Sequence, residues 1–211
     1  MKSSIVCLEK MYLFLGKSRT GSIVSRTQEV FTLKGRMETI TTEAMLAVIN
    51  QTWERLAPVL EQLEPALDAG PDAGGWTPRQ VLSHIVGAWQ RVPVHSAFFV
   101  AGRSEVPIVF GDSYWIPEWE HAPMETFRFA MQTAYEGNKA FIRQLTSSDL
   151  TRTCGTRFGV MTLGEFLMTC YVFHIGDLHI SQLEGFLIHS LPGPSKAQAV
   201  GALAPFFLSL L

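Results

Sequence analysis

The sequence predicts an all-α protein built from four helices, and three observations carry this prediction. Apolar residues recur at alternating steps of three and four along residues 41–67, which places them on one face of a helix. Two further segments begin with the pattern of an N-terminal capping box, at Thr77 and at Thr162. Of the 211 residues, 47% are apolar and 17% charged, so the chain can bury one sizeable core.

The first helix is expected to run from Thr41 or Thr42 to Leu67. Its apolar stripe consists of Leu46, Ile49, Trp53, Leu56, Leu60 and Leu63. Pro58 lies inside this pattern and lacks a backbone N–H, so a bend or a break is expected there. The sequence DAGPDAGG, residues 68–75, ends the helix and is typical of a flexible turn.

The second helix has the clearest start in the chain. Thr77 is its expected N-cap, Pro78 occupies the first helical position, and Gln80 completes the capping box. The helix carries His84 and is expected to reach the region of Pro93, with a kink at that proline.

A long connection, residues 103–123, follows the second helix and is rich in aromatic residues and proline. Long connections without helix signals in a small helical domain are often functional. Two interpretations stay open. In one, residues 105–122 form the wall of a pocket; in the other, Tyr114, Trp115 and Trp119 cover the end of the bundle.

The third helix is expected after Pro123, and a short extended piece within residues 146–161. The fourth helix begins at Thr162, where Glu165 completes the second capping box, and continues to about Leu187. This helix is apolar almost all round, which is typical of a central, buried helix.

Three parts are expected along the chain: an N-terminal appendage over residues 1–36, a helical bundle over residues 37–190, and a short C-terminal helix or tail over residues 191–211. The appendage carries seven Lys and Arg residues against two Glu, whereas the whole chain has a formal charge of −2, so the bundle is acidic. The appendage is interpreted either as disordered or as lying upstream of a misassigned start.

The composition also bears on partners and compartment. The net charge of −2 and the scattered basic residues give no electrostatic attraction to nucleic acid or to an anionic membrane. No apolar run approaches the roughly 20 residues of a spanning helix. The three cysteines show no CxxC pair, which fits a reducing compartment. A cytoplasmic protein is therefore expected.

Two short motifs lie in the second and fourth helices: WTPRQVLSH at residues 76–84 and HISQL at residues 179–183. They resemble the patterns W-S/T-x-x-E/Q-V-L-x-H-I/L and H-x-x-x-H-x-x-Q-I/L of the DinB-like (YfiT/bacillithiol-transferase-like) four-helix superfamily. The resemblance covers about residues 40–187. It implies a DinB-like up-down four-helix bundle with a long crossover connection.

The resemblance also implies a metal site in the core of the bundle. In this superfamily three histidines, one from the second helix and two from the fourth, bind a divalent metal such as zinc or nickel. Three imidazoles leave positions open for water or a substrate thiol. Carried onto this sequence, His84 matches the first ligand and His179 the last, but the middle position, four residues before His179, is Ile175.

Three interpretations of this substitution stay open. In the first, the metal site is lost, the histidines are satisfied by hydrogen bonds, and Ile175 fills the vacated volume. In the second, a π-bulge near Gly176 returns His174 to the face of His179, although a regular α-helix would set the two rings about 140° apart. In the third, the metal takes substitute donors from one stripe of the fourth helix: Cys170, His174 and Asp177.

Further candidate pocket residues lie outside the two motifs. Arg91 and His95 share one stripe of the second helix, and they are interpreted either as groups that meet an anionic substrate or as a solvated edge. Trp115 and Trp119 belong to the aromatic connection, and His121 is a candidate acid–base group at the mouth of the bundle. The sequence assigns no catalytic residue.

Two functions are compatible with these features. The first is a metal-dependent enzyme of the thiol S-transferase or hydrolase kind, with His84 and His179 as ligands and His174 as the third ligand through a distorted turn. The second is a metal-free bundle that has lost its middle ligand and binds a small ligand or a partner subunit. The expected cofactors are a divalent metal, zinc or nickel, and a low-molecular-weight thiol; the expected partners are a small-molecule substrate and a second copy of the chain.

Overall fold

The computed structural model describes residues 40–107, 114–156 and 159–190. The predicted appendage, residues 1–36, and the predicted tail, residues 191–211, lie outside the described residues, so the division of the chain into three parts stays a prediction. The described residues are mainly helical, which confirms the predicted all-α class.

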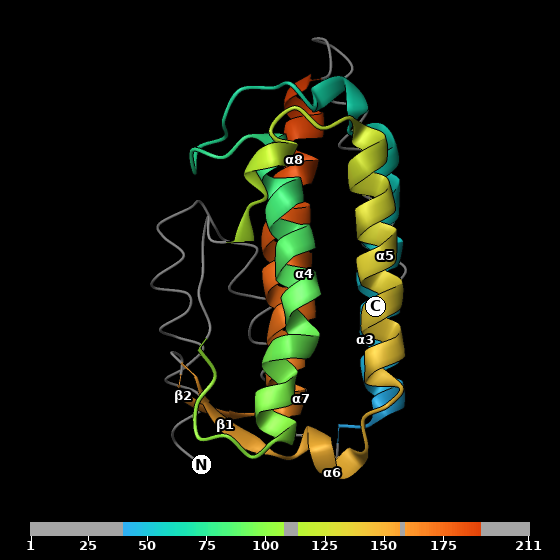
Figure 1. Ribbon diagram of the computed structural model, residues 1–211. Helices are drawn as coiled ribbons and strands as arrows, with labels where there is room; N and C mark the ends of the chain where they lie inside the picture. The colour runs from blue at the N-terminus through green and yellow to red at the C-terminus, as the bar shows by residue number, and fades with distance from the viewer. Residues whose placement is uncertain (1–39, 108–113, 157–158, 191–211) are drawn as a thin grey trace, which may run out of the picture.

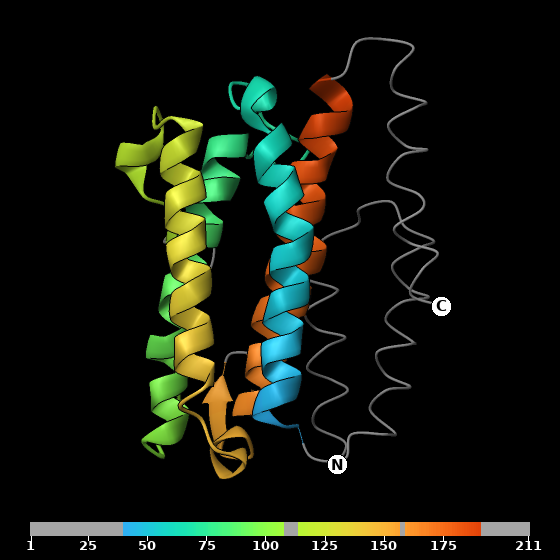
Figure 2. The ribbon, with the colours of Figure 1, turned by 90° about the vertical axis from the view of Figure 1, so that its right-hand side faces the viewer.

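Four long helical units lie side by side along one axis (Figures 1 and 2). The first three are α3 (Thr42–Gln62), α4 (Pro78–Val100) and α5 (Met124–Ile142). The fourth is a continuous unit made of α7 (Leu163–Met168), η4 (Thr169–Ile180) and α8 (Ser181–Ser190). The predicted four-helix bundle is therefore present. Within the described ranges, no helix combines the length and the apolar character that a membrane span requires.

The order of helix directions explains the long connection between α4 and α5. Helix α3 and the fourth unit run upward in Figure 1, whereas α4 and α5 both run downward. Because α4 and α5 point the same way, residues 101–123 have to return along the bundle before α5 begins. This segment contains the short helix η3 (Pro117–Trp119) and is the crossover connection that the resemblance implied.

The predicted capping boxes are confirmed. Thr77 Oγ1 accepts from the Gln80 N–H at the start of α4, and Gln80 Oε1 accepts from the Thr77 N–H in return. Thr162 and Glu165 form the same pair of bonds at the start of α7. A third capping box, which the sequence analysis missed, opens the short helix α6 (Ser147–Leu150).

Two internal prolines do not end their helices as expected. Helix α3 continues through Pro58 to Gln62 and is followed by η1 (Glu64–Ala66), so it does not break at the proline. Helix α4 continues through Pro93 to Val100, well beyond its predicted end. Buried residues flank both prolines, and this tertiary packing outweighs the missing helical hydrogen bond.

A buried polar chain fixes the fourth unit against two other helices. Tyr171 Oη in η4 donates to Asn138 Oδ1 in α5 at 2.7 Å, and Asn138 Nδ2 donates to the carbonyl oxygen of Trp89 in α4 at 3.0 Å. All three side chains are buried in the apolar core. Because satisfied buried networks favour one packing arrangement, this chain sets the position of η4 in the bundle.

The crossover is attached to α4 beside His84. The Ser83 hydroxyl accepts a hydrogen bond from the backbone N–H of Ile116. One turn further along α4, the carbonyl oxygen of Tyr114 lies against Gly87, where any Cβ atom would overlap it. The absence of a side chain at Gly87 therefore allows the crossover to pass directly over α4.

A small hairpin lies at the lower end of the bundle in Figure 1. Strands β1 (Thr153–Thr156) and β2 (Gly159–Thr162) pair antiparallel, with Cys154 opposite Met161. Gly155 also bridges Glu105 in parallel, which ties the start of the crossover to the hairpin. The short extended piece predicted from the sequence is thus confirmed.

Candidate metal centre

The segment η4 is a π-helix that lies between two α-helical segments. In a π-helix the hydrogen bonds run from residue i to residue i+5, so each turn holds about one residue more than an α-helical turn. His174 and His179 are five residues apart, and the wider turn brings their ring centroids to 4.7 Å from each other. The widened turn that one of the three interpretations required near Gly176 is therefore present.

His84 of α4 and the two histidines of η4 converge in the bundle. His174 Nε2 lies 3.1 Å from His84 Nε2 and 3.2 Å from His179 Nε2. One ring nitrogen from each of the three residues lies within 4.8 Å of the other two. Among the described residues, this is the one group of three or more His, Cys, Asp or Glu side chains with metal-binding spacing. We call it the three-histidine cluster.

The nitrogen spacing in the cluster fits coordination of one divalent ion. With Zn–N bonds of about 2.0–2.1 Å, two ligand nitrogens are about 3.3–3.4 Å apart at tetrahedral positions and about 2.9 Å apart at adjacent octahedral positions. The separations of 3.1 and 3.2 Å lie between these values. These two separations are therefore compatible with coordination of a single ion by His174 together with His84 and His179.

Burial holds His174 and His179 in the protonation state that binds metals. Burial lowers the pKa of His179 to about 4. It also lowers the pKa of His174 well below the usual 6.5, and the neighbouring His179 and His84 lower it further. Because a neutral imidazole is the form that coordinates a metal, these rings are ready to act as ligands at neutral pH.

A chain of hydrogen bonds continues from the cluster to the loop before α4. His179 Nδ1 donates to Gln182 Oε1 at 2.9 Å, and Gln182 Nε2 donates to Asp72 Oδ2 at 2.6 Å. The other carboxylate oxygen of Asp72 accepts from the backbone N–H groups of Gly74 and Trp76. Because the Gln182 oxygen can only accept, the proton of neutral His179 lies on Nδ1, and the Nε2 lone pair faces the cluster.

Aromatic rings surround two of the imidazoles. Trp76 stacks on His179 with a centroid distance of 5.7 Å and meets His84 edge-on at 5.0 Å. From the crossover, Trp115 meets Trp76 edge-on at 4.9 Å, and the Tyr114 ring lies 5.6 Å from that of His84. These rings keep water away from that side of the cluster, which strengthens electrostatic interactions inside it.

Of the proposed substitute donors, Cys170 and Asp177 do not join the cluster. Asp177 is exposed, and its carboxylate lies 3.8 Å from the Arg55 guanidinium. Cys170 packs against the apolar core, and burial raises the pKa of its thiol to about 12. A thiol with so high a pKa stays protonated near neutral pH and is a poor metal ligand and nucleophile. The interpretation that relied on Cys170 and Asp177 is therefore not supported by their positions.

Ile175 occupies the family's middle-ligand position and is fully buried in the core. It does not leave the cluster one ring short, because His174 supplies the third imidazole from the neighbouring position. The metal-free alternative stays a prediction, because the position of His174 does not decide whether a metal is bound.

Arg91 and His95 lie near the cluster without being part of it. The Arg91 guanidinium carbon lies 4.9 Å from the centre of the Tyr114 ring, which in turn contacts His84. His95 is buried on the other side of Tyr114, and burial followed by the Arg91 charge lowers its pKa. Arg91 is exposed and His95 is buried, so both interpretations stay open for Arg91, whereas a solvated edge does not describe His95.

The remaining pocket candidates separate into two groups. Trp115 contacts Trp76, and Trp76 in turn contacts His84 and His179. Trp119 instead packs edge-on against Phe127 of α5 at 5.5 Å and covers the core, and His121 is exposed at the surface. The position of Trp119 fits the interpretation in which the connection covers the bundle, whereas the interpretation of residues 105–122 as a pocket wall stays a prediction.

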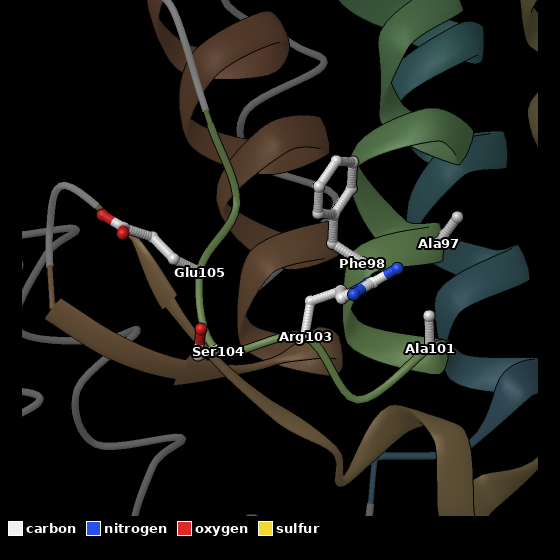
Figure 3. Close-up of a pocket in the computed structure, with 6 residues that line it drawn as sticks. All are labelled: Ala97, Phe98, Ala101, Arg103, Ser104 and Glu105. Atoms are coloured by element: carbon white, nitrogen blue, oxygen red, sulfur yellow. The ribbon is translucent and has the colours of Figure 1, made fainter.

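An open surface pocket of about 470 Å³ lies at the opposite end of α4 (Figure 3). Six residues line it: Ala97, Phe98, Ala101, Arg103, Ser104 and Glu105. No motif in the sequence points to this place. None of the three histidines lines it, so it is separate from the cluster.

The fold and the cluster together define a helical bundle with a candidate three-histidine metal site. The sequence profile of the DinB superfamily matches residues 49–177, which is more than half of the chain. The chain belongs to the DinB superfamily.

One solved structure with a similar fold is that of YfiT from Bacillus subtilis, which is described as a probable metal-dependent hydrolase with an unusual four-helix bundle topology. The two chains are 20% identical with a TM-score of 0.59, over 71% of this chain and 89% of YfiT. At this identity the likeness establishes the shared fold. No curated protein matches the sequence significantly.

The lowered pKa of His179 predicts that the metal-free protein loses stability in acid. The unfolded chain takes up a proton at this histidine near pH 6.5, whereas the folded chain does so only near pH 4. The free energy of unfolding should therefore fall below pH 6.5, by roughly 2 kcal/mol at pH 5 from His179 alone. Urea unfolding of the metal-free protein at pH 7 and pH 5 measures this loss.

In the His179→Gln variant the difference between the two pH values should shrink by a similar amount. The exposed His121 provides the matched control, and His121→Gln should leave the difference as it is in the wild type. Equal pH dependence in His179→Gln and the wild type would show that His179 is not buried in neutral form.

The link from His179 to Asp72 predicts an effect of Gln182 on metal affinity. Gln182→Leu removes the acceptor for His179 Nδ1 but keeps the side-chain volume close to that of glutamine. Loss of such an outer partner typically lowers metal affinity about 10- to 100-fold, because the ring loses its preferred orientation. Competition titration of zinc against a chromophoric chelator measures the change; unchanged affinity in a folded variant contradicts the assigned role.

Proposed function

We propose that the protein is a metal-dependent enzyme of the hydrolase or thiol-transferase kind, in which the three-histidine cluster holds one divalent ion. The observation that carries this proposal is the convergence of three Nε2 atoms at separations of 3.1 and 3.2 Å. Nitrogen atoms that face one another at these separations can share a proton or bind the same ion. Three imidazole donors suit zinc or nickel.

The residues around the cluster have separate tasks in this proposal. Bound to three imidazoles, an ion of this kind supplies Lewis acidity, which activates water or a thiol as a nucleophile near neutral pH. Gln182 and Asp72 orient His179 through their hydrogen bonds. Trp76 shields the cluster from water on one side.

The exposure of the three residues suggests a direction for substrate access in this proposal. As whole residues, His84 and His179 are buried and His174 is partly exposed, so we place the approach of a small-molecule substrate on the side of His174. Arg91 is exposed above the Tyr114 ring, beside His84. In this proposal Arg91 meets an anionic group of the substrate.

The first test is the metal content of tag-free protein purified without chelator, measured by elemental mass spectrometry and again after reconstitution with zinc or nickel. We expect close to one ion per chain. His84→Ala should reduce the content to background while the far-ultraviolet circular dichroism stays helical. A wild type that takes up no metal, or a His84→Ala variant that keeps a full equivalent, contradicts the proposed site.

The second test separates the reaction types. Metal-loaded and metal-stripped protein are assayed on activated esters and amides for hydrolysis, and on electrophilic acceptors with low-molecular-weight thiols for transfer. We expect turnover in one of the two panels that disappears on stripping and returns with the metal. Stoichiometric metal without metal-dependent turnover in either panel contradicts the proposed enzymatic role.

A further inference from the structure

Arg55 of α3 reaches the junction between the π-helix η4 and the α-helix α8. Its Nη1 donates to the carbonyl oxygen of Gly176 at 2.9 Å. Its Nε and Nη2 donate to the two carboxylate oxygens of Glu184 at 3.0 and 2.8 Å, and Nη2 also donates to Ser181 Oγ at 2.8 Å. One guanidinium thus joins a carbonyl of the π-helix to two side chains of the helix that follows.

A second side chain of α3 contacts the π-helix backbone about one turn away. The Thr52 hydroxyl lies 3.3 Å from the carbonyl oxygen of Tyr171. The same oxygen faces Gly176, where an added Cβ would lie 3.1 Å away. Tyr171 and Gly176 are five residues apart, which is the spacing of a π-helical hydrogen bond. Helix α3 therefore contacts η4 at both ends of one widened turn.

Contacts from outside are needed because π-helical turns are rare and occur mostly as single widened turns at functional sites. In a regular α-helix His174 would lie about 140° around the axis from His179 and could not face it. The π-helical register of η4 is thus a condition for the three-histidine cluster. Within the described parts of the chain, Thr52 and Arg55 of α3 donate to backbone carbonyls of η4 from a neighbouring helix.

We propose that Arg55 is a positioning residue of the three-histidine cluster. By binding the Gly176 carbonyl, it holds η4 in the π-helical register and so keeps His174 in the cluster. Arg55 itself contacts none of the three histidines. The expected effect of Arg55 on metal affinity rests on the proposed function. The effect of Arg55 on the backbone of η4 does not, and it can be measured in metal-free protein.

An ordinary surface ion pair does not account for these contacts. Exposed pairs usually contribute little and have loose geometry. Arg55 and Glu184 are only 30% and 23% exposed, and the pair is bidentate. The additional bond to the Gly176 carbonyl requires the planar fork of an arginine, which fixes distance and direction together.

The first experiment uses metal-free protein and follows backbone amide hydrogen exchange by mass spectrometry. In Arg55→Met, exchange should become at least about tenfold faster in peptides that cover residues 171–181. Arg128→Met is the matched control, because Arg128 also donates to backbone carbonyls and to a glutamate, but lies on α5 away from the cluster. It should leave residues 171–181 unchanged. Unchanged exchange in Arg55→Met overturns the proposal.

The second experiment is a double-mutant cycle on zinc affinity with Arg55→Met, His174→Ala and the combined variant. If Arg55 acts through His174, Arg55→Met should lower affinity about tenfold in the wild-type background and have no effect in the His174→Ala background. Arg55→Lys, which keeps the charge and one donor, should recover part of the loss. If Arg55→Met lowers zinc affinity by the same factor in both backgrounds, the variant destabilises the protein in general, and the proposed positioning role of Arg55 is overturned.

The two experiments distinguish failure of this inference from failure of the proposed function. A wild type that binds neither zinc nor nickel rejects the proposed metal site, and the exchange data then decide alone whether Arg55 holds η4. Normal zinc binding together with unchanged exchange and affinity in Arg55→Met leaves the metal site intact and rejects the role of Arg55.

Discussion

His174→Ala is expected to lower zinc affinity by about 100-fold or more while the bundle stays folded. Replacing one of three imidazole ligands removes a full coordination bond. The binding free energy of structural zinc sites is roughly 10–16 kcal/mol for about four ligands, so each ligand contributes substantially to affinity. The bundle should stay folded because His174 is not one of the residues that form the apolar core. Competition titration with zinc, together with circular dichroism, measures both outcomes.

Cys170→Ser is the matched control for this prediction. Cys170 lies one α-helical turn before His174 and was a candidate donor, but the structure places it outside the cluster. The serine variant should keep the zinc affinity of the wild type. The opposite pattern, with affinity lost in Cys170→Ser and kept in His174→Ala, would return the assignment to the substitute donors.

Gly87→Ala is expected to lower the free energy of unfolding by about 3 kcal/mol, because the new methyl group overlaps the carbonyl oxygen of Tyr114. Neither atom can move away easily, because the new methyl group is attached to the backbone of α4 and the carbonyl oxygen belongs to the backbone of the crossover. For a chain of this size the change corresponds to a fall in melting temperature of roughly 6–12 °C. Urea unfolding and calorimetry of the metal-free protein measure it.

Gly137→Ala is the control, because Gly137 lies in the exposed face of α5 and nothing comes within 4 Å of an added Cβ there. Alanine is the better helix former, so this variant should be more stable than the wild type by about 0.5–1 kcal/mol. A Gly87→Ala variant as stable as Gly137→Ala would mean that the crossover does not lie against α4 beside His84.

The helix starts could be predicted because a capping box depends on residues three positions apart. Thr77 with Gln80, and Thr162 with Glu165, form the expected bonds. Helix α4, by contrast, extends past Pro93 because the buried residues after it hold the chain in the helix. Packing of this kind depends on residues from other helices and is not visible in the local sequence.

The candidate site could be predicted in part. The resemblance assigned His84 and His179, but the spacing of His174 allowed three interpretations. The register of η4 depends on contacts from α3, more than 100 residues earlier in the chain, and no local pattern in the fourth helix specifies it. The five-residue spacing of His174 and His179 was enough to propose a widened turn, but not to prefer it over the other two interpretations.

Asp72 was missed because its loop resembled an ordinary flexible turn. In the sequence DAGGW its carboxylate accepts from the backbone N–H groups two and four residues later, which is an Asx-type turn with a recognisable signal. This signal predicts that the loop is fixed, but it does not predict that Asp72 binds Gln182. The bond to Gln182 arises only when α8 packs beside the loop.

The central claim is that the π-helix of η4 brings three histidines around one divalent ion. Diffraction from zinc-soaked or zinc-grown crystals, with data above and below the zinc absorption edge, tests it most directly. We predict one anomalous peak per chain, about 2.0–2.1 Å from the Nε2 atoms of His84, His174 and His179. A peak held by other residues, or a cluster without a peak in which the His174 ring points away from His179, would contradict it.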